Sequence, residues 1–335
     1  MIAFESRAAT VLYNLILAQP REGAFLLPEN VCPIVPLVLC KAGRAFELID
    51  ICPRSLCIDH ALVLDRWRSE RAPRPAGLLY VRSFGSLFDA SALFAQLKSI
   101  EPSALLIDDR CLCIPKFDLP KQFDADVLLY STGHAKTVDL GFGGYGLLRD
   151  GVPYRRRAMA FDNAHLDELT RSYKDAISTR SKLPYCDSNW LDCSAPPVPW
   201  ARYRELVQTE MSRAIACKHS LNEIYRKALP PSIQLPAAFQ SWRFNINVAD
   251  KLGVLSAIVS GGLFASGHYD SLAAIFSMKT GPISAKLHAH VINLFNDRYF
   301  DIEKARRVVD IILKQEPQLL PGPFNFDENA DWQQC

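Results

Sequence analysis

One lysine in this chain stands between two features that would keep its amine out of bulk water. Lys136 follows the apolar run of residues 127–130 and precedes the glycine-rich stretch of residues 141–144. The apolar run predicts a buried strand, and a second strand is expected after the glycines. An amine held in such a crevice loses its proton more readily and can then attack a carbonyl carbon. The spacing therefore points to a lysine that does chemistry.

Two polar residues extend the pattern around this lysine. Asp109 follows the apolar run of residues 104–107, and Ser131 follows the strand that precedes Lys136. A pyridoxal cofactor acts as an electron sink while its ring nitrogen is protonated, and a carboxylate at a strand end keeps it so. The cofactor phosphate needs hydroxyl and backbone N–H donors, which Ser131 and the start of a first helix can supply. We therefore predict pyridoxal 5'-phosphate bound as a Schiff base to Lys136. Asp109 is the predicted partner of the ring nitrogen, and its neighbour Asp108 is the alternative for that role.

The elements that position these residues follow a repeated order through the first 150 residues. Short apolar runs, each closed by polar residues, alternate with helical patterns. The runs are residues 24–27, 45–49, 77–81, 104–107 and 127–130, and the helical patterns are residues 5–18, 33–42 and 90–100, the last with Asp89 as its cap. The alternation predicts a mostly parallel sheet covered on both faces, with ligands at the carboxyl ends of its strands.

The pattern changes after residue 150. Residues 151–199 are rich in Pro, Ser and Asp in their later part and are expected to form an irregular connection or a dimer contact. A long amphipathic helix is predicted next, and a small α+β unit after it. The predicted elements are helices at 200–229, 249–260 and 301–314, strands at 244–248 and 287–294, and a loop after Glu316. We expect a large cofactor-binding domain over residues 1–200, and the long helix with a small C-terminal domain over residues 201–335.

The composition and net charge limit the kinds of partner that we expect the protein to bind. The chain has 335 residues, 49% of them hydrophobic and 22% charged, and a formal net charge of +2. This balance gives no basic field, so we expect no nucleic acid and no membrane as a partner. The ten cysteines include no C-x-x-C pair, and without a secretory signal we expect them to be reduced in a cytoplasmic protein. His288 and His290 lack a third ligand nearby, so no metal is expected.

Residues 131–144 resemble the lysine motif of the DegT family of sugar aminotransferases, which belongs to the fold-type I pyridoxal phosphate enzymes. That motif runs Ser-x-x-x-x-Lys-x-x-x-x-Gly-Glu-Gly-Gly, and this chain matches it with Phe142 in the Glu position. The resemblance implies an α/β fold, with a fold-type I aminotransferase-like large domain around a mainly parallel sheet and a smaller α+β C-terminal domain. It also implies that Asp109 is the partner of the cofactor ring.

The resemblance assigns further residues to the site. It implies a phosphate-binding turn at the start of the first helix, a substrate pocket lined from the C-terminal domain, and a weak substitute for the family's Asn-Tyr-Arg motif, which reaches the phosphate across the dimer. His134, two residues before the lysine, either faces the rim of the cofactor or stabilises the loop. The three features that the resemblance implies fall on Ser6, Arg7 and Ala8 for the phosphate-binding turn, His268 and Tyr269 for the substrate pocket, and Asn189 for the cross-dimer contact.

The activity that the resemblance implies is that of a homodimeric, pyridoxal phosphate-dependent aminotransferase. It would move an amino group, from glutamate by family analogy, to a nucleotide-linked keto-sugar used in polysaccharide biosynthesis. Two alternatives stay open. Leu112 stands where the family has Gln or His, and the cross-dimer motif is absent in its usual form, which suits the same cofactor with a different substrate or reaction. The chain could also keep the fold as a non-catalytic binding or regulatory module.

Overall fold

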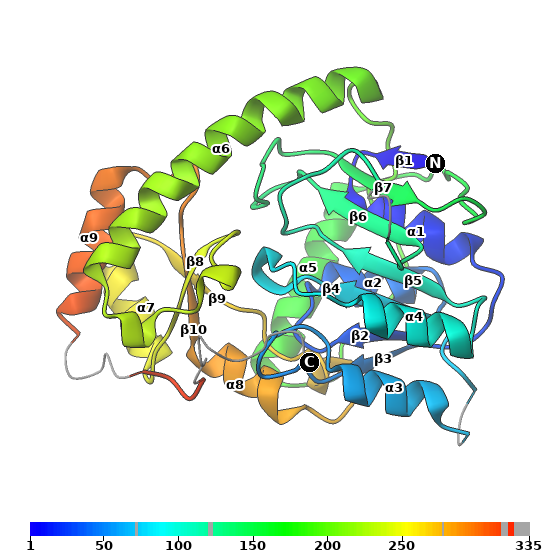
Figure 1. Cartoon of the computed structure of the whole chain (residues 1–335), viewed down its shortest axis with the longest axis horizontal. Coiled ribbons are helices and arrows are strands. Elements are labelled where there is room, and N and C mark those ends of the chain that lie inside the picture. The colour runs from blue at the N-terminus through cyan, green and yellow to red at the C-terminus, as the bar shows by residue number, and fades with distance from the viewer. Residues whose placement is uncertain (71–72, 120–122, 277, 316–320, 325–335) are drawn as a thin grey trace.

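The apolar runs of the first 150 residues pair into one seven-stranded sheet in the computed structural model (Figure 1), which describes residues 1–70, 73–119, 123–276, 278–315 and 321–324. The strands lie in the order β1-β7-β6-β5-β4-β2-β3. Their bounds are Ile2–Glu5 (β1), Phe25–Pro28 (β2), Phe46–Ile49 (β3), Gly77–Val81 (β4), Leu105–Asp109 (β5), Val127–Ser131 (β6) and Gly144–Leu148 (β7). Strands β2 to β6 are parallel, and β7 runs antiparallel between β6 and β1. The predicted mostly parallel sheet is confirmed.

Helices cover both faces of this sheet, and the alternation along β5 shows what each face meets. Leu105 and Ile107 share a core with α1 (Ala8–Ala18) and α2 (Ile34–Lys41). Leu106 belongs to the opposite core, with α3 (His60–Arg68) and α4 (Ser91–Ile100). Since successive strand residues point to opposite faces, Asp108 and Asp109 at the end of β5 must point to opposite sides of the sheet.

A second, three-stranded antiparallel sheet forms the core of the C-terminal part, in the order β8-β10-β9. The long helix α6 (Trp200–Ala228) arches from the large domain to this part, as Figure 1 shows. The remaining elements there are β8 (Phe244–Asn247), α7 (Lys251–Ser260), β9 (Ala265–Gly267), α8 (Pro282–His290), β10 (Val291–Leu294) and α9 (Ile302–Leu313). Short 3-10 turns cover Ser83–Gly85, Pro231–Ile233, Ala237–Phe239 and Ala274–Phe276.

Three local predictions were wrong. The helix expected over residues 5–18 begins only at Ala8, because Ile2–Glu5 pairs with β7 as a strand. The segment 151–199, predicted to be irregular, contains α5 (Asn163–Thr179). Its apolar residues recur at helical spacing and pack on the core that α1 and α2 share, namely Leu166, Leu169, Tyr173, Ala176 and Ile177. The prediction rested on the Pro- and Ser-rich later part of the segment, which follows this helix. The strand expected over 287–294 starts only at Val291, because Pro282 opens a helix that continues through His290.

Two other predictions remain as they were. The loop expected after Glu316 lies outside the described residues, apart from residues 321–324. The division of the chain into residues 1–200 and 201–335 stays a prediction, although α6 begins at Trp200.

The buried carboxylate of Glu29 and the half-buried carboxylate of Asp50 fasten the first turn of α8, and Ser271 before it, to the ends of β2 and β3. Glu29, at the end of β2, accepts hydrogen bonds from the hydroxyls of Ser271 and Ser284 at 2.6 and 2.8 Å. Asp50, after β3, accepts from the backbone N–H groups of Ile283 and Ser284 at 3.0 and 2.9 Å, where α8 starts. These bonds fix the C-terminal segment over the carboxyl edge of the parallel strands.

A substitution at Gly144 tests whether β7 lies as close to the start of α1 as the structure shows. A Cβ at this position would overlap the backbone N and Cα of Ala8. We expect Gly144→Ala to lower the free energy of unfolding, measured by urea denaturation, by at least about 2 kcal/mol. Gly262→Asn is the matched control, because Gly262 has a φ of +72° and nothing within 4 Å of a built Cβ. Equal stability of the two variants would contradict the close approach.

Candidate active site

A cavity of about 300 Å³ lies at the carboxyl ends of β5 and β6, beside the start of α1. Its polar walls come from Arg7, Asp109, Ser131, His134, Lys136 and Tyr269. Asp109 and Lys136 also line a smaller recess of about 40 Å³, which reaches His268 and Asn30. The fold thus brings together residues that are far apart in sequence, at the sheet edge where parallel sheets bind ligands.

The loop that carries Lys136 joins β6 to β7 and is held at several points. The Thr132 hydroxyl lies 2.7 Å from both the Phe142 carbonyl oxygen and the Tyr203 hydroxyl on α6. The carboxylate of Asp139 accepts hydrogen bonds from the backbone N–H groups of Ala135 at 2.9 Å and Gly141 at 2.8 Å. These bonds fix the backbone on both sides of Lys136, so the lysine has a defined place at the cavity.

Asp109 is buried, with 7% of its surface exposed. Burial raises the pKa of its carboxyl, while the hydrogen bond from the Cys111 N–H, at 2.9 Å, and the positive charge of Lys136 act in the opposite direction. A cationic partner inside the cavity would stabilise the ionised form of this buried carboxylate.

Asp108 has partners of its own on the opposite face. Arg82 holds both carboxylate oxygens, with Nε–Oδ1 and Nη2–Oδ2 distances of 2.7 and 2.8 Å, and Arg110 binds Oδ2 at 2.7 Å. Burial acts to raise the pKa of Asp108, but the two guanidinium groups outweigh it and hold that pKa below its usual value. Between the two aspartates left open by the sequence, Asp109 is therefore the one that shares the cavity with Lys136.

The far end of the cavity is formed by the start of α1 and the end of β6. Ser131 is buried, and its hydroxyl accepts a hydrogen bond from the Gly133 N–H at 3.3 Å. Arg7 precedes the first residue of α1, and its Nη1 donates to the Gly141 carbonyl at 2.7 Å. Ala8, the first residue of α1, also lines this end. The first N–H groups of a helix have no partner within the helix, so this end suits an anion.

Two predicted cofactor residues lie elsewhere in the subunit. The side chain of Ser6 turns to the Asp192 carbonyl, 3.4 Å away, and Ser6 is not among the residues that line the cavity. Asn189 is exposed beside α5, where its backbone N–H donates to His165 and its carbonyl accepts from Asp162 at 2.8 Å. The structure does not bring Asn189 to the cavity of its own subunit.

The remaining predicted residues lie around the cavity and its recess. His134 is exposed at the rim, next to Gly141. His268 is buried in the recess, with its Nε2 3.3 Å from Nδ2 of Asn30. Burial lowers the pKa of His268 to about 3, so its ring is neutral at physiological pH. Tyr269 lines both the cavity and the recess.

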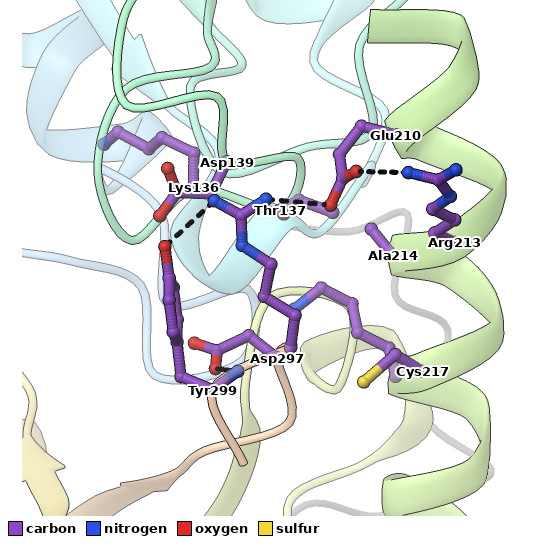
Figure 2. Close-up of a pocket in the computed structure, with 11 residues that line it drawn as sticks. Lys136, Thr137, Asp139, Glu210, Arg213, Ala214, Cys217, Asp297 and Tyr299 are labelled. Carbon is purple, nitrogen blue, oxygen red and sulfur yellow. Dashed lines mark hydrogen bonds and ion pairs between the residues drawn. The ribbon is translucent and has the colours of Figure 1, made fainter. Parts of the chain in front are cut away.

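A second cavity of about 300 Å³ lies between the lysine loop and α6 (Figure 2), and Lys136, Thr137 and Asp139 help to line it. Glu210 on α6 forms ion pairs there with Arg213 and Arg298, at 3.8 and 3.3 Å. Figure 2 shows the Lys136 side chain extending away from these residues. Lys136 therefore borders both cavities, whereas Asp109 lines the first and not this one.

The sequence analysis missed two thiols in the cavity wall. Cys32 precedes α2, and Cys111 follows β5. Burial raises the pKa of the Cys111 thiol well above its usual value, so it lines the cavity as a neutral group. Its position, in the turn directly after Asp109 and β5, was the available signal.

Comparisons with known proteins support the fold. No family model matches the chain, and no curated protein matches it in sequence. Among solved structures, a DegT DnrJ EryC1 StrS aminotransferase from Brucella abortus has a TM-score of 0.64 at 15% identity, over 93% of this chain and 85% of the other. The sugar aminotransferase CalS13 from Micromonospora echinospora has a TM-score of 0.63 at 16% identity, over 94% and 87%.

A third match is PseC from Helicobacter pylori, an aminotransferase involved in the biosynthesis of pseudoaminic acid. It has a TM-score of 0.65 at 13% identity, over 93% of this chain and 86% of the other. Identities this low establish the fold alone. The chain therefore has the fold of the DegT-type, pyridoxal phosphate-dependent aminotransferases, as the sequence motif predicted.

The raised pKa of Asp109 predicts how a substitution changes stability. At neutral pH the native state carries a buried carboxylate that water would solvate in the unfolded state, so its ionisation costs stability. We expect Asp109→Asn to stabilise the protein without cofactor at pH 7. The gain should disappear as the pH falls below the pKa of the unfolded carboxyl, because the wild-type group is then protonated in both states. Urea denaturation at several pH values measures this difference.

Asp108→Asn is the matched control, and we expect it to act in the opposite direction. It leaves the buried Arg82 without its charge partner and should cost about 3–5 kcal/mol at pH 7. The pKa of Asp108 is depressed in the native state, so this cost should fall as the pH drops through that pKa. Destabilisation by Asp109→Asn at pH 7 would contradict the assignment of the two aspartates.

Proposed function

We propose that this protein is a pyridoxal phosphate-dependent aminotransferase with Lys136 as the attachment point of the cofactor. The observation that carries the proposal is the shared cavity of Lys136 and Asp109, which joins an amine and a buried carboxylate next to an anion-binding helix start. The fold of the structural neighbours supports the same reading, since their names describe aminotransferases.

The groups that line the cavity fit the cofactor one by one. The amine of Lys136 supplies the nucleophile for its aldehyde, and the buried Asp109 supplies the carboxylate for its ring nitrogen. The Ser131 hydroxyl and the first N–H groups of α1, at Ala8, supply donors for its phosphate. When bound, pyridoxal phosphate stabilises negative charge that develops on the substrate carbon next to the amino group.

The residues of this chain then have separate tasks. Asp109 keeps the proton on the ring nitrogen, because a buried carboxylate favours a cation beside it. With the cofactor bound, the amine of Lys136 would act as general base and acid, taking a proton at the donor carbon and giving it back to the amino-group acceptor. The bonds from Asp139 hold the backbone of the lysine loop in place during these transfers.

For the substrates, we propose glutamate as the amino donor and a nucleotide-linked keto-sugar as the acceptor, handled by a cytoplasmic homodimer. The names of two neighbours, a sugar aminotransferase and an aminotransferase of pseudoaminic acid biosynthesis, support the sugar. His268 and Tyr269 would contact the substrate from the C-terminal part. The neutral His268 ring would contribute a hydrogen bond rather than a charge.

One observation favours the alternative of a different substrate with the same cofactor. The recess beside Asp109 and Lys136 is lined by Leu112, an apolar side chain where the family has Gln or His. The Leu112 side chain donates no hydrogen bond to a polar substrate, although Asn30 and Ser83 line the same recess.

Reduction of the purified protein with borohydride tests the attachment point. We expect peptide mass analysis to find a pyridoxyl group on the peptide that contains Lys136, because reduction makes the carbon–nitrogen bond permanent. Lys136→Ala should abolish the tag, whereas Lys182→Ala, at an exposed lysine, should leave it unchanged. A tag on another lysine, or no tag after incubation with pyridoxal phosphate, would show that the proposal is wrong.

A single-turnover assay with glutamate tests the reaction. We expect one 2-oxoglutarate per bound cofactor from the wild type and none from Lys136→Ala, because the variant lacks the amine proposed to move the proton at the donor carbon. A protein that binds the cofactor but releases no 2-oxoglutarate would favour another amino donor or another reaction. A protein that binds no cofactor would favour the non-catalytic module.

A further inference from the structure

We infer that the side chain of Arg7 is the cation that neutralises the cofactor phosphate, and that it comes from the same subunit as Lys136. This inference rests on the proposed function and identifies the residue whose positive charge balances the phosphate. In the family that the lysine motif resembles, a motif reaching across the dimer contacts the phosphate. Here the residue placed as a weak substitute, Asn189, is exposed beside α5 and does not line the cavity.

The geometry around Gly133 shows where an anion would lie. A Cβ built on Gly133 would lie 3.5 Å from Oγ of Ser131 and 3.8 Å from Nη1 of Arg7. A hydroxyl and a guanidinium therefore border the same small space, which the absent side chain of Gly133 leaves open. The start of α1 lies against the same cavity, so its N–H groups and its dipole add to the attraction for an anion.

The guanidinium of Arg7 has donors to spare. Among the described residues, its hydrogen bond is the one from Nη1 to the Gly141 carbonyl, at 2.7 Å. Nε forms an ion pair with Oδ2 of Asp192 at 3.8 Å, a distance too long for a hydrogen bond, so this contact leaves the N–H donors available. An arginine has five N–H donors, so most of them can bind phosphate oxygens, and the bond to Gly141 orients the group.

An anion-binding role also explains why an arginine occupies the N-cap position of α1. Arg7 precedes α1 as the cap residue, yet its side chain makes no capping hydrogen bond. Ser, Thr, Asp and Asn are the residues that serve as caps, and a cation there opposes the helix dipole. A bound phosphate turns this unfavourable charge into a favourable one. The structure thus gives Arg7 a role in binding an anion that it lacks as a cap.

Comparing two ligands that differ only in the phosphate tests the inference. We expect Arg7→Met to raise the dissociation constant of pyridoxal 5'-phosphate about tenfold or more, because a charge-assisted contact is lost. The dissociation constant of pyridoxal, which has no phosphate, should stay the same. Arg7→Lys should restore part of the affinity, since a lysine keeps the charge but not the fork of donors. Equilibrium titrations followed by absorbance measure all of these values.

Arg155→Met, at an exposed arginine, is the matched control and should change neither constant. Inorganic phosphate should weaken binding of pyridoxal to the wild type less than it weakens binding of pyridoxal 5'-phosphate. Equal losses for both ligands in Arg7→Met would assign Arg7 to the loop through Gly141 and overturn the inference, as would an unchanged affinity for the phosphorylated ligand. A wild type that binds neither ligand would instead show that the proposed function is wrong.

Discussion

The site depends on a carboxylate that the fold buries beside an amine. Asp109 ends β5 under the cover of α1 and α2, and its raised pKa shows that burial outweighs the stabilising effect of Lys136 and of the Cys111 N–H. A protein tolerates such a group where it is useful, since removing the charge would be favourable for stability alone. A cationic ligand in the cavity would satisfy this carboxylate, which makes the pair a receptor for a protonated ring.

The surrounding structure keeps this pair in place from three directions. On the opposite face, Arg82 and Arg110 bind Asp108 and fix the end of β5. On the lysine side, Asp139 and Thr132 tie the loop to its own backbone and to α6. At the ends of β2 and β3, Glu29 and Asp50 bind Ser271 and Ser284 of the C-terminal part, which brings His268 to the recess. The contacts of Arg82, Tyr203, Glu29 and Asp50 join elements that are distant in sequence, so the site exists only in the folded chain.

Much of this could be predicted from the sequence, and the reason is local. Buried parallel strands are continuous apolar runs, so β2 to β6 were recognised within one or two residues, and the lysine motif lies within one loop. The failures have physical causes. β1 is a short strand whose partner, β7, lies about 140 residues away. The helical spacing of Leu166, Leu169 and Tyr173 was available for α5, but the prediction followed the Pro- and Ser-rich stretch after it. The choice between Asp108 and Asp109 required the side-chain partners, and the role of the Arg7 side chain required the space next to Gly133.

The protonation of the cofactor ring is the most direct test of the central pair. Nitrogen NMR of pyridoxal 5'-phosphate labelled at the ring nitrogen reports that protonation in the bound state. We predict the chemical shift of a protonated ring in the wild type at neutral pH, and that of an unprotonated ring in Asp109→Ala. Equal protonation of the ring in both proteins would contradict a site built on Asp109 and Lys136. So would a chemical shift that stays at the value of the unbound cofactor.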